Sequence, residues 1–373
     1  MARWLAALLL SVCVVSAFLA HWSLLDGAPR NSLRLFLDNQ ADRPFAYRIF
    51  APALVRAIDA ALPAPAQGFL ADRVAPRFHA RYVEPLRTLF ESLIPGISAR
   101  ADADWAEARY RRSYVLMVML MLASFTAAML LIRRAACLLG ASAFRADSVM
   151  LLYALITPTL FLKGGYFYDF TEQLGAAALI CCVLQARWRL ALLTLLLMQA
   201  NKETALLMVA FLAPYAWRTL RWRMLAPAAL ALFLCVLLLL WERWTYAGLP
   251  GQPTEWHLGG NLSFWSSGSS WRATEDFHQV GVALPRTTFL YFALLALATG
   301  WWRRGATLPA ASLAFGVLAV LLLCMGFEDE FRNLSLAMPL LVLLVAEVRP
   351  GKMSATASSS CQTSLQPNDI GRH

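Results

Sequence analysis

The sequence predicts an all-α, polytopic transmembrane protein. Of its 373 residues, 59% are hydrophobic and only 15% are charged, and the mean hydropathy is +0.55. A soluble domain keeps about a quarter of its residues charged, because its surface faces water. Several apolar runs also approach the roughly 20 residues that a helix needs to cross a bilayer. Composition and run length therefore indicate one membrane domain.

The positive charge is distributed as in the cytoplasmic loops of membrane proteins. The formal net charge is +10, and the arginines gather in short clusters at the ends of apolar runs, such as Arg133-Arg134 and Arg303-Arg304. An excess of Arg and Lys marks cytoplasmic loops, whereas a nucleic-acid interface needs a basic stripe along one face. We therefore expect no nucleic-acid partner.

Cysteine and histidine spacing gives no sign of a metal site or a disulfide framework. The 7 cysteines and 5 histidines are scattered, and no pair has the spacing of metal ligands. No motif assigns a cofactor. The one cofactor that remains possible from the sequence is a divalent cation held by loop carboxylates.

The apolar runs predict about eight full spans and one re-entrant helical pair. Residues 1–352 form this domain, with external loops 25–112, 163–172, 245–286 and 326–333 and a disordered cytoplasmic tail, 353–373. Both termini are expected in the cytoplasm. A retained signal-anchor suits a chain with further spans better than a signal peptide cleaved after Ala17. The predicted spans are Trp4–Leu24, Tyr114–Ile132, Ser148–Leu162, Phe170–Gln185, Leu225–Trp241, Thr287–Trp302, Ala306–Met325 and Leu334–Val348.

The run Leu190–Trp217 is predicted to enter the membrane and return. It has basic clusters at both ends and the polar segment Gln199–Thr204 at its middle. A single crossing would put all the later arginine clusters outside, against the positive-inside bias. A returning pair of helices keeps them inside and places its polar tip beside protein or a wet cavity.

Charged residues of three external loops and of this tip are expected to share one extracytoplasmic cavity. Carboxylates there could act as general bases, and Arg or Lys could bind a phosphate. Asn201 is expected to cap a helix Lys202–Trp217, whose N-terminus suits a phosphate. The alternative is that the loops are merely polar, that Glu203 complements the helix dipole and that Lys202 snorkels to the interface.

Two acidic motifs, Leu37-Asp38-Asn39 and Tyr168-Asp169-Phe170, follow the first span and the third. Their order resembles that of GT-C-type integral membrane glycosyltransferases, over the first half of the chain. The segments Arg43–Arg48 and Asn201–Thr204 are similar to those of bacterial membrane proteins with a GT-C-like layout. The resemblance implies that Asp38 is the catalytic base and that Asp169 assists acceptor or metal binding. It departs from the family at Asn39, because an Asp-Glu pair is common there.

The resulting hypothesis is transfer of a sugar from a polyprenyl-phosphate donor in the membrane lipid to an acceptor outside a bacterial inner membrane. Its first rival is a transporter or flippase of a lipid-linked or anionic substrate, although two related halves are not found. Its second rival is a non-catalytic subunit of an envelope-assembly complex. Protein partners are not predicted. The site residues are catalytic Asp38 and Asp169, with Arg48, Lys202, Glu203 and Arg332 for the lipid phosphate.

Overall fold

A computed structural model of the chain describes residues 2–85, 91, 96–209, 214, 225–271, 276–279, 282–285, 287–305, 307–328 and 330–347. Their regular structure is helical, which confirms the predicted class, apart from one hairpin that the sequence did not predict. In it β1 (Asp276–Gln279) pairs antiparallel with β2 (Val282–Pro285). The predicted tail 353–373 lies outside the described residues.

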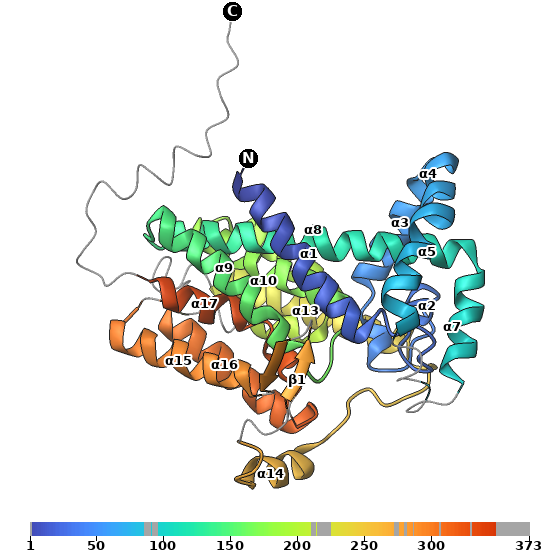
Figure 1. The fold of residues 1–373 in the computed structure, drawn as a ribbon. Coiled ribbons are helices and arrows are strands. Elements are labelled where there is room, and N and C mark those ends of the chain that lie inside the picture. The colour runs from blue at the N-terminus through green and yellow to red at the C-terminus, as the bar shows by residue number, and fades with distance from the viewer. Residues whose placement is uncertain are drawn as a thin grey trace, which may run out of the picture.

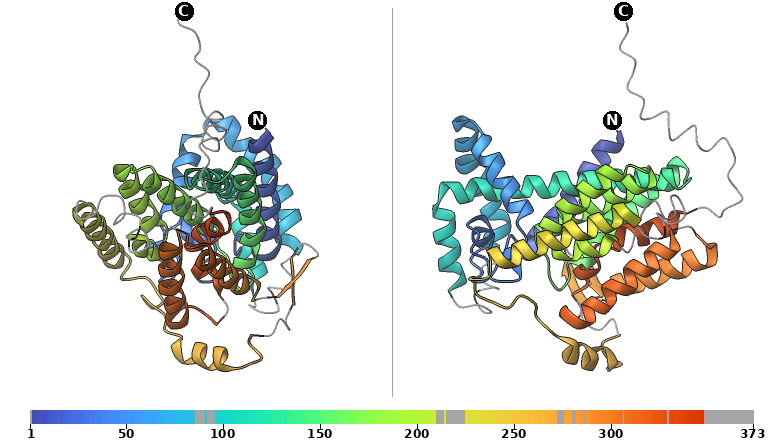
Figure 2. Two further views of the ribbon diagram at one scale, coloured as in Figure 1. Left: turned by 90° about the vertical axis from the view of Figure 1, so that its left-hand side faces the viewer. Right: turned by 180° about the vertical axis from the view of Figure 1, so that it is seen from behind.

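The body of the molecule is a helical bundle (Figures 1 and 2). Among the described helices, four are long and apolar enough to cross a membrane: α1, α8, α13 (over Ala226–Thr245) and α16. These four indicate a membrane protein, while the count of eight spans stays a prediction. The helices of the bundle are α1 (Ala2–Trp22), α8 (Ala108–Leu138), α9 (Ala143–Leu160), α10 (Tyr168–Leu184), α11 (Trp188–Asn201), α13 (Leu225–Thr245), α15 (Thr288–Arg303), α16 (Leu308–Met325) and α17 (Met338–Ala346).

The last predicted span, Leu334–Val348, contains a much shorter helix than a crossing needs. α17 has 9 residues, about 14 Å at 1.5 Å per residue, against a hydrocarbon core of about 30 Å. All but one of its residues are buried, because it packs against α9, α15 and α16. Its apolar sequence therefore faces protein, and hydropathy alone does not distinguish that from lipid.

Short helices of the first loop gather at one end of α8 (Figure 1). α3 is amphipathic and turns Ala51, Val55 and Asp59 inward. Arg112, in the first turns of α8, binds the Asp59 carboxylate with Nε at 2.8 Å and holds α3 against α8. The elements are α2 (Leu33–Leu37), η1 (Phe45–Tyr47), α3 (Phe50–Ala61), α4 (Ala64–Phe69), the π-helical η2 (Leu70–Val74), α5 (Ala75–Phe78), the π-helical η3 (His79–Val83) and α7 (Ile97–Ala106).

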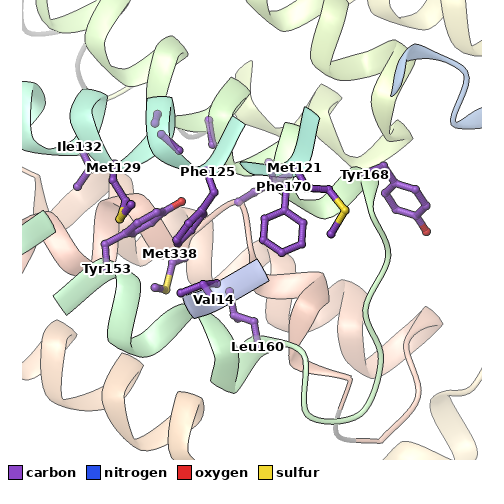
Figure 3. Close-up of a cluster of buried hydrophobic side chains, with 14 of the residues drawn as sticks. Val14, Met121, Phe125, Met129, Ile132, Tyr153, Leu160, Tyr168, Phe170 and Met338 are labelled. Carbon is purple, nitrogen blue, oxygen red and sulfur yellow. The ribbon is translucent and has the colours of Figure 1, made fainter. Parts of the chain in front are cut away.

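One face of α8 forms the centre of the core (Figure 3). Met121, Phe125 and Met129 recur at helical spacing and are fully buried. The Phe125 ring stacks on Tyr153 of α9 at 5.6 Å between centroids and meets Phe170 of α10 edge-on at 5.9 Å. Because lipid tails are as apolar as these side chains, the core is stabilised by close packing rather than by removal from water.

The bundle has two chemically different ends. At the first, which we call the arginine end, Arg3 and Arg133 both bind Asp147 and Arg134 binds Gln185. At the second, the loop end, the chain segments that follow α1, α9, α11 and α16 meet the start of α10. There the Trp22 indole N–H donates to the Phe161 carbonyl at 2.6 Å.

Candidate functional site

Seven charged side chains meet at the loop end, and we call them the charge cluster. Six are buried, and Glu203 is partly exposed. They come from the first loop, the start of α10, the end of α11, η4 (Glu203–Leu207) and the segment up to η6 (Phe331–Leu334). The members are Arg48, Asp169, Glu172, Lys202, Glu203, Glu330 and Arg332.

The first two turns of α10 contribute two carboxylates. Asp169 and Glu172 are three residues apart, so they project from the same face of the helix, and both are almost completely buried. Asp169 Oδ2 accepts the Tyr166 backbone N–H at 2.9 Å, which closes the start of the helix. Asp169 Oδ1 and Glu172 Oε1 have no hydrogen-bond partner among the described residues.

Lys202 lies where α11 breaks. Its extended backbone, with φ −163° and ψ 131°, ends α11 and precedes η4. Its Nζ lies 3.0 Å from Glu172 Oε2 and 3.7 Å from Asp169 Oδ1, and the side chain is only 2% exposed. The snorkelling alternative is therefore wrong, because the ammonium group points into the protein and is paired there.

Asn201 does not cap a following helix, contrary to the prediction. It is the last residue of α11, and its amide donates to the Tyr168 carbonyl at 2.9 Å and accepts from Thr171 Oγ1 at 2.6 Å. These bonds fix the end of α11 against α10. Residues 210–213 and 215–217 of the predicted helix Lys202–Trp217 lie outside the described residues.

Arg332 connects the last loop to α10. Its Nη1 lies 3.7 Å from Asp169 Oδ1, its Nε donates to Glu330 Oε1 at 2.7 Å, and its guanidinium lies 4.3 Å from the centroid of the Tyr166 ring. Burial raises the pKa of Glu330, but the charge and hydrogen bonds of Arg332 outweigh it and hold that pKa below the ordinary value. The pair is therefore ionised at neutral pH.

Arg48 connects the first loop to the helix break at Lys202. Its Nη1 donates to the Tyr168 hydroxyl at 2.7 Å, and its Nη2 lies 3.1 Å from Glu203 Oε1. The guanidinium also lies 5.0 Å from each of the Phe45 and Tyr168 ring centroids, a cation–π arrangement. The neighbouring Ile49 N–H donates to the Ala200 carbonyl, so the first loop covers the exposed end of α11.

The charge cluster is nearly balanced within itself. Its three cations face four carboxylates, and each cation has at least one carboxylate within 4 Å. Lys202, Arg48 and Arg332, which the sequence predicts as phosphate ligands, thus already bind protein carboxylates. The described residues contain no group of three or more His, Cys, Asp or Glu side chains that could hold a metal ion.

Asp38 lies apart from the cluster. It follows α2, and its carboxylate is 3.5 Å from Arg34 Nε and 3.6 Å from Arg109 Nη1. The side chain is 31% exposed, so a solute could reach it. The structure thus brings together five of the six predicted site residues and separates the sixth, the expected base.

Three side chains that are not among the predicted site residues complete the cluster. Two of them, Glu172 and Glu330, belong to external loops whose charged residues are predicted to share the cavity, whereas Ser335 does not. Glu172 and Glu330 bind the cations, and Ser335 Oγ donates to Glu172 Oε2 at 2.9 Å. The spacing of Asp169 and Glu172 on one helical face was an available signal. Nothing in the sequence indicated Ser335, because its position depends on how α17 begins.

No family model matches the chain, and no curated protein or solved structure matches it.

Proposed function

We propose that this chain is a membrane glycosyltransferase that transfers a sugar from a polyprenyl-phosphate donor to an extracytoplasmic acceptor. The observation that supports it most is a reachable carboxylate, Asp38, between two guanidinium groups at the loop end of an apolar bundle. An inverting displacement needs a base on the acceptor hydroxyl and cations at the leaving phosphate. Both kinds of group are within about 4 Å of each other here.

In this proposal Asp38 is the base and Arg109 binds the phosphate. Arg109 is half exposed, and Asp38 is its only ion-pair partner among the described residues. Arg34 also pairs with Asp104 and Glu107, which makes it the less available cation. The charge cluster then fixes the surrounding loops, so Asp169 is a positioning residue rather than a group that touches the substrate.

We further propose that the loop end is extracytoplasmic and the arginine end cytoplasmic, in a bacterial inner membrane. The positive-inside bias supports this orientation, because the arginine end carries Arg3, Arg133, Arg134 and Arg303. About eight spans and one re-entrant pair, with both termini in the cytoplasm, complete the proposed topology.

The test is sugar transfer from a synthetic polyprenyl-phosphate sugar by the full-length protein in proteoliposomes. Loss of a general base typically costs about a hundred- to ten-thousand-fold in rate, and we expect a loss in that range for Asp38→Asn. Asp42→Asn is the matched control, because Asp42 is an ion-paired carboxylate of the same loop, 3.1 Å from Arg30. Near-normal turnover in Asp38→Asn would contradict the proposal.

A second candidate function is transport of a lipid-linked or anionic substrate. The helix break at Lys202, with paired charges inside the bundle, supports it, because transporters build binding sites from broken helices. The same proteoliposomes distinguish the two functions. Movement of the labelled lipid between leaflets without sugar transfer, and unaltered in Asp38→Asn, would favour the transporter.

A further inference from the structure

Glu242 is a buried carboxyl group that the proposed function does not use. It lies one turn before the end of α13, which is one of the four helices apolar enough to cross a membrane. The side chain is fully buried, and neither of its oxygens has a hydrogen-bond partner among the described residues. A polar group in this state requires an explanation, since nearly all buried polar atoms are hydrogen-bonded.

The neighbours of Glu242 include a second carboxyl group. α13 packs against α11 and against η4, which begins at Glu203, and Glu203 is close enough to act electrostatically on Glu242. Glu203 Oε1 is bound by Arg48, but its Oε2 is buried and unpartnered. The helix break and α13 thus bring two carboxyl groups together with two cations, Arg48 and Lys202. Both cations are already paired, Arg48 with Glu203 and Lys202 with Glu172.

The other groups around Glu242 do not neutralise a negative charge. α11 contributes Gln199, whose Nε2 has no described partner, and its only charged residue, Arg189, lies at its opposite end. Among the described residues, Tyr246, one turn further along the chain, is a further titratable group that interacts with Glu242. An ionised carboxylate with no cation of its own is strongly disfavoured inside a protein, and a protonated carboxyl is the usual resolution.

We propose that Glu242 and Glu203 form a buried proton-binding site, in which Glu242 carries a proton at neutral pH. Loss of this proton would leave two carboxylates beside the break, where Arg48 is already paired with Glu203. Because Arg48 also binds Tyr168 at the start of α10, the protonation of Glu242 is coupled to the contacts that hold the first loop. The proposal is independent of sugar transfer, since none of these groups takes part in that reaction.

Infrared spectroscopy of the purified full-length protein in nanodiscs tests the proposal. A protonated carboxyl has a carbonyl stretching band that a carboxylate lacks. At neutral pH we expect Glu242→Gln to remove one such band from the spectrum of the wild type. Because glutamine has the shape of the protonated acid, this variant should also unfold at the wild-type temperature.

The second variant tests the contribution of Glu203. Glu203→Gln keeps Glu242 but removes the neighbouring negative charge, so the Glu242 band should persist and disappear at a lower pH than in the wild type. Glu347→Gln is the control, because Glu347 lies at the arginine end and accepts the Thr307 N–H with both oxygens. It should leave the band unchanged.

Three results would overturn the proposal. The first is a wild-type spectrum in which Glu242→Gln removes no carboxyl band. The second is a Glu242 band that disappears at the same pH in Glu203→Gln as in the wild type. The third is a marked rise of the unfolding temperature with sodium or potassium ions that Glu242→Gln abolishes, because the site would then hold an ionised carboxylate and a metal cation.

Discussion

Lys202→Met distinguishes a structural lysine from a phosphate-binding one. Methionine keeps the length and the apolar stem of the side chain but removes the ammonium charge. In the structure that charge lies 3.0 Å from Glu172 and 3.7 Å from Asp169, in a side chain that is only 2% exposed. The variant therefore leaves two buried carboxylates without their shared cation, and we expect it to destabilise the protein.

The distances give the size of this effect. With an effective dielectric constant of about 20, the attractions at 3.0 and 3.7 Å are about 5.5 and 4.5 kcal/mol. Desolvation of the ammonium group offsets much of this sum. Breaking a buried pair by removing one partner typically costs about 3–5 kcal/mol, and we expect a loss of unfolding free energy in that range.

The assay is unfolding of the purified protein in detergent, followed by helical circular dichroism. Lys163→Met is the control, since Lys163 is exposed and exposed pairs contribute at most about 1 kcal/mol. Adding Glu172→Gln to Lys202→Met removes one unpaired charge, so a coupling of roughly 0.5–3 kcal/mol should appear. Unchanged stability of Lys202→Met, together with weakened binding of a polyprenyl phosphate, would refute this reasoning and restore the phosphate role.

Three further predictions concern other parts of the molecule. The pKa of Glu330 is below its ordinary value, so the pair with Arg332 should stabilise the protein fully above the ordinary glutamate pKa. This stabilisation should disappear as the pH falls through the lowered pKa of Glu330. In Glu330→Gln, the unfolding temperature should lose this part of its pH dependence. Asn261→Ala should expose α14 (Leu258–Ser266) to protease at a cost of about 1–3 kcal/mol, because the Asn261 amide donates to three carbonyls at the end of α16. In a cysteine-free protein, an impermeant thiol reagent should label a cysteine at Ser267 from outside and none at Ser359; the reverse pattern would contradict the proposed orientation.

The helical class and the clustering of charge follow from local sequence properties. Apolar runs between arginine clusters are sufficient to predict helices, and a polar segment at the middle of such a run is where α11 ends, at Asn201. The helix lengths cannot be predicted from these local sequence properties. α17 is short because the chain before it forms η6 and contributes Arg332 to the charge cluster, a requirement of tertiary structure.

The pairing within the cluster could not be predicted, because it depends on the relative rotation of helices. Asn201 has the residue type of an N-cap, but α10 offers it a carbonyl and a hydroxyl, and these tertiary bonds replace the cap. Asp38 and Asp169 are comparable motifs in sequence. They differ in the structure because α10 buries Asp169 at its first turn, whereas Asp38 follows a short helix on the surface.

The separation of Asp38 from the charge cluster suggests how the two regions depend on each other. Phe36, two residues before Asp38, packs edge-on against Phe167 at 5.0 Å and lies 5.9 Å from Tyr168. Tyr168 in turn accepts a hydrogen bond from Arg48, which binds Glu203 at the break. A change in the cluster can therefore reach Asp38 through the packing of α2 on the start of α10. It can also reach Asp38 through α3, because Arg56 Nη1 donates to the Leu37 carbonyl at 2.8 Å. Under the proposed function, variants of the cluster should alter the position of the base, whereas variants of Asp38 should leave the cluster intact.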